Sequence, residues 1–513
     1  MEDFKIVAKT FQGLECVLAE ELRALGAHDI EEGNRMVSFT GDKAMLYKAN
    51  FHLRTAIRVL VPFYTFQADS ADMVYEVCKA YNWERYLTVD STFAVDAVVN
   101  SEDFNHSKFV AYRVKDAIAD FFRQRYDRRP NVSVANPDIT IHIHISHNEC
   151  TLSLDSSGDS LHRRGYRQEQ VEAPLNEVLA AGMILLTGWH GETDFIDPMC
   201  GSGTLPIEAA LIARGIAPGL FRTQFAFEKW KDFDKDLFES IYNDDSMEKE
   251  CNCKIYGYDI DGRAIGIAKR NAKAAGLADT ITFEKADIKD FRQPENPSII
   301  VTNPPYGERI GGPDVTELYK VIGERFKNAF KGNSAWVISY HYECFDSIGL
   351  KPSAKIPLFN GQLPCELRKY EIFAGKYSDF RERGESLSRK PAAGRRGQTL
   401  RQRAAMEDKA ASGEELGSER RERRDERFDR RDERPQRRDD RRERRDERPQ
   451  RRDDRHERSE RRGERFDRKN ERPQRRDERP QREDKPKSSA LTRIGDDMSV
   501  LRHHKRKERT INE

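Results

Sequence analysis

The chain has 513 residues, which is too long for one ordinary domain of roughly 100–200 residues, so we expect two or three folded units. Its 90 Lys and Arg nearly balance its 89 Asp and Glu, and the formal net charge is +1. Residues 381–513 hold 46 basic and 33 acidic residues, which leaves 44 and 56 for residues 1–380. The composition therefore predicts an acidic folded body and a basic tail that is too poor in apolar residues to form a core.

Cysteine usage and hydropathy exclude several classes of protein. The eight cysteines, at positions 16, 78, 150, 200, 251, 253, 344 and 365, include no C-x-x-C pair. We therefore expect neither a metal site nor a disulfide framework. No run approaches the ~18 apolar residues that span a bilayer, and the first ten residues lack a basic-then-apolar signal. We expect a cytoplasmic protein with no membrane partner.

The first 157 residues have the pattern of a small α+β region. Apolar and polar positions alternate in two predicted strands, and an amphipathic pattern predicts one long helix between them. The strands are expected at residues 93–99 and 139–145, and the helix at residues 110–126. His142 and His144 share one strand face, and we interpret them as solvent-facing side chains rather than as metal ligands.

A different pattern begins near residue 172, where short apolar runs alternate with helical stretches. The predicted strands occupy residues 193–197, 255–259, 281–283, 299–303 and 335–339. The predicted helices occupy residues 204–214, 262–275 and 315–331. Such alternation predicts an α/β fold with a doubly wound, mostly parallel sheet, whose ligands bind outside the carboxyl ends of the strands.

The tail repeats itself, because residues 430–441 recur identically at 444–455. Recurrent proline and the lack of apolar residues exclude a solenoid or a coiled coil, so we expect disorder. Two interpretations stay open. The tail is either a solvated, charge-balanced spacer or a flexible arm that adds unspecific affinity for RNA phosphates.

A glycine-rich loop follows the first strand of the α/β region. The strand ends at Asp197, and residues 198–203 lead into the next helix. Gly201 and Gly203 lack the side chains that would keep a ligand away from the backbone. A dinucleotide-binding fold is disfavoured, because Pro206 replaces the third glycine and the next strand-end acid comes much later than about 20 residues on.

Acidic residues also follow the next two strands. Asp259 is placed to accept hydrogen bonds from both ribose hydroxyls, and Asp287 can accept from an adenine amino group. Asp197 can face a methionine ammonium. One such carboxylate could be a turn or cap residue, but three at successive strand ends predict an adenosyl-binding site. The expected cofactor-binding residues are Asp197, Met199, Cys200, Gly201, Ser202, Gly203, Thr204, Asp259, Ile260, Asp287 and Ile288.

The fourth strand runs into Asn303-Pro304-Pro305-Tyr306, and this segment indicates the reaction. An exocyclic amino group of a base is not basic, because its lone pair is delocalised into the ring. The Asn303 side-chain oxygen and the Pro304 carbonyl can accept its two N–H bonds and aim the lone pair at a sulfonium methyl group. The prolines fix that carbonyl, and Tyr306 offers a ring for stacking. We expect these four residues to be catalytic, with S-adenosylmethionine as cofactor and with positioning as the main source of catalysis.

Cys200 raises an alternative, since a nucleophilic cysteine would indicate methylation of a pyrimidine carbon through a covalent adduct. It stands in the expected cofactor loop, and the Asn303–Tyr306 segment suits an amine. We therefore interpret Cys200 as a packing residue.

Several segments together resemble one family, the THUMP-containing class I RNA methyltransferases. They are residues 161–167, 173–177, 193–210, 216–222, 227–230, 257–261 and 302–309. Within this family, the segments resemble the N-terminal half of ribosomal large-subunit methyltransferase L, which makes N2-methylguanosine in 23S rRNA. The resemblance covers roughly residues 1–375.

The resemblance implies a Rossmann-like methyltransferase domain preceded by an α+β region and followed by a disordered tail. The expected ranges are a ferredoxin-like segment at 1–60, a THUMP RNA-binding domain at 61–157, the methyltransferase domain at 165–376 and the tail at 381–513. The chain departs from the family in its acidic body and in the charged tail, which stands where some relatives carry a second methyltransferase domain. RNA affinity is therefore expected from the tail or from local basic clusters, with Arg125, Arg128, Arg163, Arg164 and Arg167 as candidates.

The target stays open at this point. Guanine N2 in 23S rRNA is the preferred expectation, with ribosome assembly intermediates as further partners. Guanine N2 in tRNA and adenine N6 are alternatives, because the four-residue segment serves either amine. From another class, the chain could be an RNA-binding assembly factor that keeps a methyltransferase fold.

Overall fold

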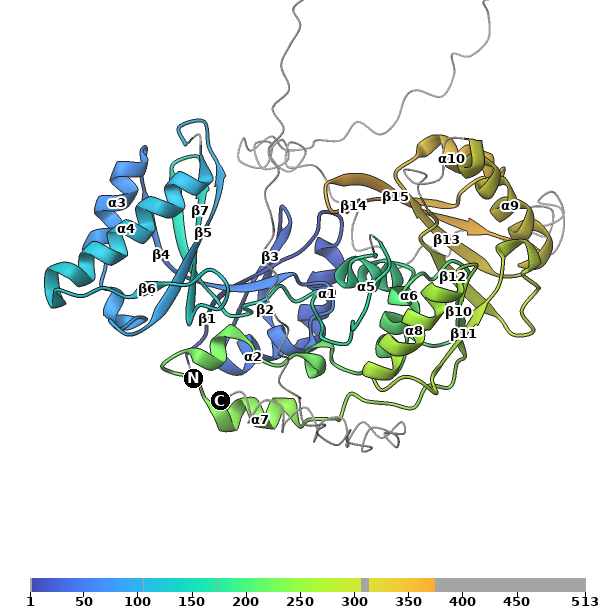
Figure 1. Cartoon of the computed structure of the whole chain (residues 1–513), viewed down its shortest axis with the longest axis horizontal. Coiled ribbons are helices and arrows are strands. Elements are labelled where there is room, and N and C mark those ends of the chain that lie inside the picture. Colours follow the sequence, from blue (N-terminus) through green and yellow to red (C-terminus); the bar gives the residue numbers. More distant parts are fainter. Residues whose placement is uncertain (1, 105, 173, 306–312, 374–513) are drawn as a thin grey trace, which may run out of the picture. The chain divides into compact units, whose positions relative to one another are not determined.

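The structure is a computed structural model that describes residues 2–104, 106–172, 174–305 and 313–373. The tail and Tyr306 lie outside these ranges. The strands of the N-terminal part are β1 (Phe4–Lys9), β2 (His28–Gly33), β3 (Met36–Gly41), β4 (Arg58–Gln67), β5 (Thr92–Asn100), β6 (Asn131–Val132), β7 (Ile139–Ser146) and β8 (Glu149–Asp155). The helices are α1 (Glu15–Leu25), α2 (Lys43–His52), α3 (Ala71–Ala80) and α4 (Ser107–Tyr126). The strands form one sheet in the order β2-β3-β1-β4-β8-β7-β5-β6 (Figure 1).

The strand β4 joins the two parts of this sheet. Its first residues pair with β1, where Val59 lies opposite Ala8, and the strand pairs with β8 from Leu60 to Gln67. Val59 belongs to a core formed with β1, β3, α1 and α2, whereas Phe63 packs against a separate core of β5, β7, β8 and α4. The expected boundary between residues 60 and 61 therefore falls inside one strand.

The strand β7 follows the expected alternation, with one correction. Ile141 and Ile143 are buried, and His144 is exposed. His142 was expected to face solvent, but its side chain is only 15% exposed and its Nε2 lies 3.5 Å from the Asp96 carboxylate. Burial and the nearby Arg58 lower the pKa of His142 to about 4.

The second sheet confirms the doubly wound prediction. Its strands are β9 (Asp194–Asp197), β10 (Ile255–Asp259), β11 (Ile281–Lys285), β12 (Ser298–Thr302), β13 (Ser334–Ser339), β14 (Ala354–Asn360) and β15 (Leu363–Glu371). The helices are α5 (Glu177–Leu186), α6 (Thr204–Ala213), α7 (Lys235–Tyr242), α8 (Gly262–Ala274), α9 (Pro313–Ala329) and α10 (Tyr342–Ser347). The order is β11-β10-β9-β12-β13-β15-β14, in which β15 runs antiparallel to both neighbours and the other pairs are parallel. Across the described ranges, no helix combines the length and apolar character needed to cross a membrane.

Alternate residues of the parallel strands pack on opposite faces of this sheet. Phe195 and Ile299 face a core shared with α5, α6 and α8, whereas Ile196 and Ile300 face α9 and α10 (Figure 1). Both faces are covered, which is why these strands are short continuous apolar runs. The carboxyl ends of the strands remain available for a ligand.

The core on the α5 and α6 side continues into the N-terminal segment. Buried residues of α1, α2 and β3 belong to the same cluster as those of α5 and α6. The packing is close, because a Cβ on Gly182 of α5 would lie 2.6 Å from both δ-carbons of Leu14. Residues of the expected 1–60 segment thus pack directly on the α/β part that contains the second sheet.

Candidate active site

A cleft of about 1200 Å³ lies at the carboxyl ends of β9, β10 and β12. It brings together most residues that the sequence placed at strand ends. Those that line it are Asp197, Met199, Cys200, Gly201, Ser202, Thr204, Asp259, Ile260, Asp287, Ile288, Asn303, Pro304 and Pro305. Sequence reasoning did not single out the part of the lining contributed by residues 170–172, or Asn360 and Leu363 from β14 and β15.

The two loop glycines have different roles. Gly201 and Gly203 have φ angles of 54° and 84°, in the left-handed region that favours glycine. Gly203 does not line the cleft, and a Cβ there would lie 3.0 Å from Ala268 and from Phe283. Side chains of α8 and β11 therefore fill the space that a side chain at position 203 would need, and a role of Gly203 in cofactor binding stays a prediction.

Asp259 fixes the loop against the end of β10. Its Oδ2 accepts a 2.8 Å hydrogen bond from the amide of Gly201, and its Oδ1 accepts one of 2.9 Å from Asp261. Each oxygen keeps a second lone pair, so the carboxylate can also accept from a diol. Asp287 likewise caps a turn, because its Oδ1 accepts a 3.0 Å bond from the amide of Lys289. Both carboxylates combine a turn role with a place on the cleft wall.

Asp197 is the most buried carboxylate of the cleft, at 2% exposed. Its Oδ1 accepts hydrogen bonds from the Thr302 hydroxyl at 2.8 Å and from the amide of Met199 at 3.1 Å. Burial raises the pKa of Asp197 to about 7, and the charge of Asp259 acts in the same direction. A cation beside this carboxylate would stabilise its ionised form.

Thr302 was missed by the sequence reasoning. It is fully buried, and its bond to Asp197 ties the end of β12 to the end of β9. Asn303, the next residue, is half-buried, Pro304 is buried and Pro305 is exposed, and all three line the cleft. The segment expected to hold the amine therefore lies in the same cleft as the loop. A hydroxyl residue directly before Asn303 was the available signal.

The surroundings of Cys200 agree with a packing residue. It is 7% exposed, and its amide donates a 2.8 Å hydrogen bond to the carbonyl of Tyr258. Burial raises the pKa of the thiol, and the charges of Asp197 and Asp259 raise it further. A thiol held in its protonated form is a poor nucleophile.

The cluster of Arg163, Arg164 and Arg167 separates in the structure. The Arg163 side chain is 68% exposed. Arg164 is 2% exposed and donates to buried carbonyls and to Glu208, and the Arg167 side chain is 16% exposed and pairs with Glu177. The expectation that Arg164 and Arg167 bind RNA is therefore corrected, because their guanidinium groups already serve internal acceptors.

The other two arginine candidates lie on the surface of the N-terminal part. Arg125 is 2.9 Å from Glu84, and Arg128 is 2.6 Å from Asp90. Both arginine side chains are about half or more exposed, at 49% and 63%. Ion pairs between exposed side chains are weak, so each arginine can exchange its carboxylate partner for another anion. The role of Arg125 and Arg128 in RNA binding stays a prediction.

Comparison with known families matches three consecutive parts of the chain. The RMKL-like methyltransferase domain matches residues 164–369, the THUMP domain matches residues 68–155, and the RlmL ferredoxin-like domain matches residues 5–60.

Two curated relatives illustrate the likeness. A putative RNA methyltransferase, slr0064 of Synechocystis sp., is 40% identical over 369 residues, which are 71% of this chain and 96% of the relative. The ribosomal RNA large subunit methyltransferase K/L of Syntrophotalea carbinolica is 41% identical over 382 residues, which are 72% of this chain. The match covers 53% of the latter, so the chain spans about half the length of that relative.

Solved structures give the same picture. The putative methyltransferase SMU.472, in complex with SAH, is 32% identical, with a TM-score of 0.65 and coverage of 73% of this chain and all of its own. A predicted N6-adenine-specific DNA methylase from Listeria monocytogenes is 36% identical, with a TM-score of 0.65 and coverage of 72% of this chain and 97% of its own. TrmN from Thermus thermophilus shares the fold at 19% identity, with a TM-score of 0.53.

Proposed function

The chain belongs to the THUMP-containing, S-adenosylmethionine-dependent RNA methyltransferases, and on this premise we propose that it methylates an exocyclic amino group, with guanine N2 of 23S rRNA as the preferred target. The observation that carries the proposal is that Asn303 and Pro304 line the same cleft as the glycine loop. A donor of methyl groups and an amine acceptor can then meet in one cleft.

The cleft residues fit S-adenosylmethionine. Ile260 is 64% exposed on the cleft wall, and such an apolar side chain suits the face of an adenine ring. Asp259 retains lone pairs for a ribose diol, and Asp287 lies after the neighbouring strand. The buried Asp197 suits an ammonium group. When bound, the cofactor supplies an electrophilic methyl group.

The chain's own residues then orient the acceptor. In the proposed mechanism the Asn303 amide oxygen and the Pro304 carbonyl accept the two N–H bonds of the target amine. This arrangement reduces delocalisation of the nitrogen lone pair and fixes its direction. Thr302 and Asp197 hold the segment at a constant distance from the loop through their 2.8 Å hydrogen bond. The nitrogen would take the methyl group as the bond between that methyl and the sulfonium sulfur breaks, which leaves a neutral thioether, and the nitrogen would release one proton to water without a strong base.

The choice of base and RNA rests on the relatives. The Syntrophotalea relative is named for large-subunit ribosomal RNA, which supports 23S rRNA or its assembly intermediates as the substrate. The Listeria structure is named a predicted N6-adenine-specific DNA methylase, which supports adenine N6 as the second candidate target. The exposed Arg125, Arg128 and Arg163 are proposed to contact RNA phosphates. Two alternatives, methylation of guanine in tRNA and an assembly factor that only binds RNA, are distinguished by the experiment below.

The decisive test is mass spectrometry of nucleosides from rRNA and tRNA of cells with and without the gene. We expect N2-methylguanosine to be lost from 23S rRNA alone. A loss confined to tRNA, or a loss of N6-methyladenosine, would refute the preferred substrate but not the amine chemistry. No change in any methylated nucleoside would favour the binding factor.

The variant Asn303→Ala tests the chemistry in purified protein. We expect methyl transfer to fall about a hundredfold or more, because the amine loses one of its orienting acceptors, while RNA binding is retained. Asn243→Ala is the matched control, since Asn243 is exposed at the end of α7. Unimpaired transfer in Asn303→Ala would contradict the mechanism.

A further inference from the structure

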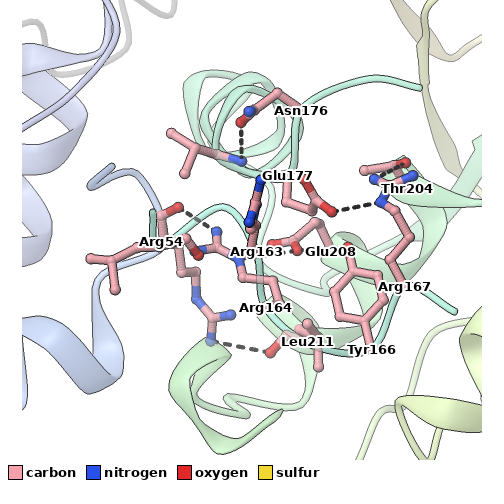
Figure 2. Close-up of polar contacts among 12 residues, drawn as sticks. Arg54, Arg163, Arg164, Tyr166, Arg167, Asn176, Glu177, Thr204, Glu208 and Leu211 are labelled. Atoms are coloured by element: carbon pink, nitrogen blue, oxygen red, sulfur yellow. Dashed lines mark hydrogen bonds and ion pairs between the residues drawn. The ribbon is translucent and has the colours of Figure 1, made fainter. Parts of the chain in front are cut away.

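The guanidinium group of Arg167 donates hydrogen bonds to the glycine loop from two of its nitrogens. Its Nη1 donates a 3.1 Å hydrogen bond to the Ser202 hydroxyl, and its Nη2 donates one of 3.0 Å to the Thr204 hydroxyl. Its Nε donates to the Glu177 carboxylate at 2.7 Å, and Nη2 also reaches the carbonyl of Leu175 at 3.2 Å. Figure 2 shows the guanidinium between Glu177 and Thr204.

Arg167 itself does not line the cleft, whereas Ser202 and Thr204 do. Both hydroxyl oxygens accept from the guanidinium, so their own hydrogens are left to donate elsewhere. Within the described part of the chain, neither hydroxyl donates to an acceptor, although both residues are nearly buried, at 3% and 4% exposed. A hydroxyl that accepts from a cation is a stronger donor, because its O–H bond is polarised.

The guanidinium keeps its charge in this position. Burial alone would lower the pKa of Arg167, but the adjacent Glu177 carboxylate raises it above its ordinary value. Two cations, Arg263 and Lys289, line the cleft themselves, and each follows one of the acids expected at the ribose and adenine, Asp259 and Asp287. Arg167 is therefore the cation that serves the loop.

A buried polar network connects the segment that contains Arg167 to the glycine loop and to α6. Asn271 of α8 is 1% exposed, and its amide nitrogen donates to the carbonyls of Ser202 and Glu169 at 3.1 and 3.0 Å. The segment next to Arg167 is thus joined to the loop a second time. Figure 2 shows a further anchor, in which Arg164 meets Glu208 of α6, whose carboxylate also accepts from Tyr166 at 2.9 Å.

The proposed cofactor, S-adenosylmethionine, has an amino-acid end that carries both an ammonium and a carboxylate. Asp197 suits the ammonium and would repel the carboxylate, which needs donors backed by positive charge. We propose that Arg167 is a positioning residue that gives the loop its affinity for the cofactor carboxylate, by orienting and polarising the hydroxyls of Ser202 and Thr204. This inference rests on the proposed cofactor site.

The experiment compares two ligands that differ only in the carboxylate. Binding of S-adenosylmethionine and of decarboxylated S-adenosylmethionine to the full-length chain is measured by calorimetry for wild type, Arg167→Gln and Arg167→Lys. We expect Arg167→Gln to bind S-adenosylmethionine about tenfold to a hundredfold more weakly, because a charge-assisted hydrogen bond usually contributes that much to affinity. Its affinity for the decarboxylated ligand should stay the same. Arg167→Lys, which keeps the charge but loses the fork, should fall between.

Two further variants guard the interpretation. Arg270→Gln is the matched control, because Arg270 pairs with Glu169 of the same segment but is 53% exposed and does not line the cleft. It should leave both affinities unchanged. Ser202→Ala keeps Arg167 in place and removes one donor, so it should also weaken only the ligand with a carboxylate. This variant covers the case in which Arg167→Gln fails to fold.

The outcomes separate the inference from the function on which it rests. An equal loss of affinity for both ligands in Arg167→Gln and Ser202→Ala would overturn the inference, since it would indicate general support of the loop. Unchanged affinities would overturn it as well. If wild type bound neither ligand, the cofactor site itself would be refuted, and the inference with it.

Discussion

The buried carboxylate of Asp197 makes cofactor affinity depend on pH in a range where most carboxylates do not titrate. Its pKa in the free protein is about 7, raised by burial, compared with about 4 for an ordinary aspartate. An ammonium bound beside it favours the ionised form. Binding at lower pH must therefore remove a proton from Asp197, and the apparent affinity should decrease as the pH falls through 7.

The size of the effect follows from the ionised fraction. With a pKa of about 7, roughly half of the carboxyl groups are ionised at pH 7.0 and about 3% at pH 5.5. The dissociation constant for S-adenosylmethionine should rise about fifteenfold between these values. The amino group of the ligand stays mostly protonated over this interval, since the pKa of an α-amino group is about 8. Among the described residues that line the cleft there is no histidine to add a competing titration.

The assay is calorimetry at pH 5.5, 6.0, 6.5 and 7.0 in buffers of different ionisation enthalpy, which also counts the protons released. Asp197→Asn is the control, because its amide oxygen can still accept from Thr302 but cannot ionise. It should bind more weakly and without dependence on pH. The reasoning would be refuted by a wild-type affinity that is constant from pH 5.5 to 7.0, or by the same slope in the variant.

Three other expectations concern stability and the tail. Gly203→Ala should destabilise the protein by about 1–3 kcal/mol more than Gly188→Ala in urea unfolding, because both positions have positive φ but only Gly203 has neighbours in contact with an added Cβ; equal losses would contradict this. Arg164→Met should lower the free energy of unfolding by about 3–5 kcal/mol, because Glu208 stays buried without its cation. Adding Glu208→Leu should restore most of that stability. A double variant no more stable than Arg164→Met would refute the pairing argument. Deletion of residues 381–513 should weaken RNA binding and flatten its dependence on salt, whereas unchanged affinity at both low and high salt would favour the spacer.

The parallel strands could be predicted because both faces of the sheet are covered. Such strands are short apolar runs, and each ends where a polar residue meets the ligand edge. The strand predicted at residues 255–259 has those bounds in the structure, and the one predicted at 299–303 ends one residue earlier, at Thr302. The loop and Asn303 then fall into one cleft because parallel strands place their carboxyl ends together.

Other elements left no such signal. Residues 177–184 of α5 are all buried, so the helix has no polar face and no amphipathic period. The strand β15 lies between β13 and β14, an order that depends on pairing between distant segments and on no local pattern. The sequence therefore predicted the ligand-binding half of the sheet better than its antiparallel edge.

The arginines near residue 165 show why charge alone does not identify an RNA surface. Three basic residues close together in sequence suggested one exposed cluster. Their carboxylate partners lie elsewhere, with Glu177 ten residues beyond Arg167 and Glu208 forty-four beyond Arg164. These tertiary contacts decide whether an arginine is buried in an ion pair, and the sequence around each arginine does not predict them.

The two sets of neighbours of β4 bear on how the protein can be divided. A fragment that begins at residue 61 would lose β1, β2 and β3, together with the first residues of β4. β1 pairs with residues 58–60 of β4, which this fragment also lacks, and residues 61–67 keep their pairing with β8. The surface newly exposed to water is the apolar side of α5 and α6, which packs against α1, α2 and β3 in the intact chain. Removing the first segment should therefore yield a species that aggregates through this apolar surface, and the N-terminal segment acts as a cover for α5 and α6.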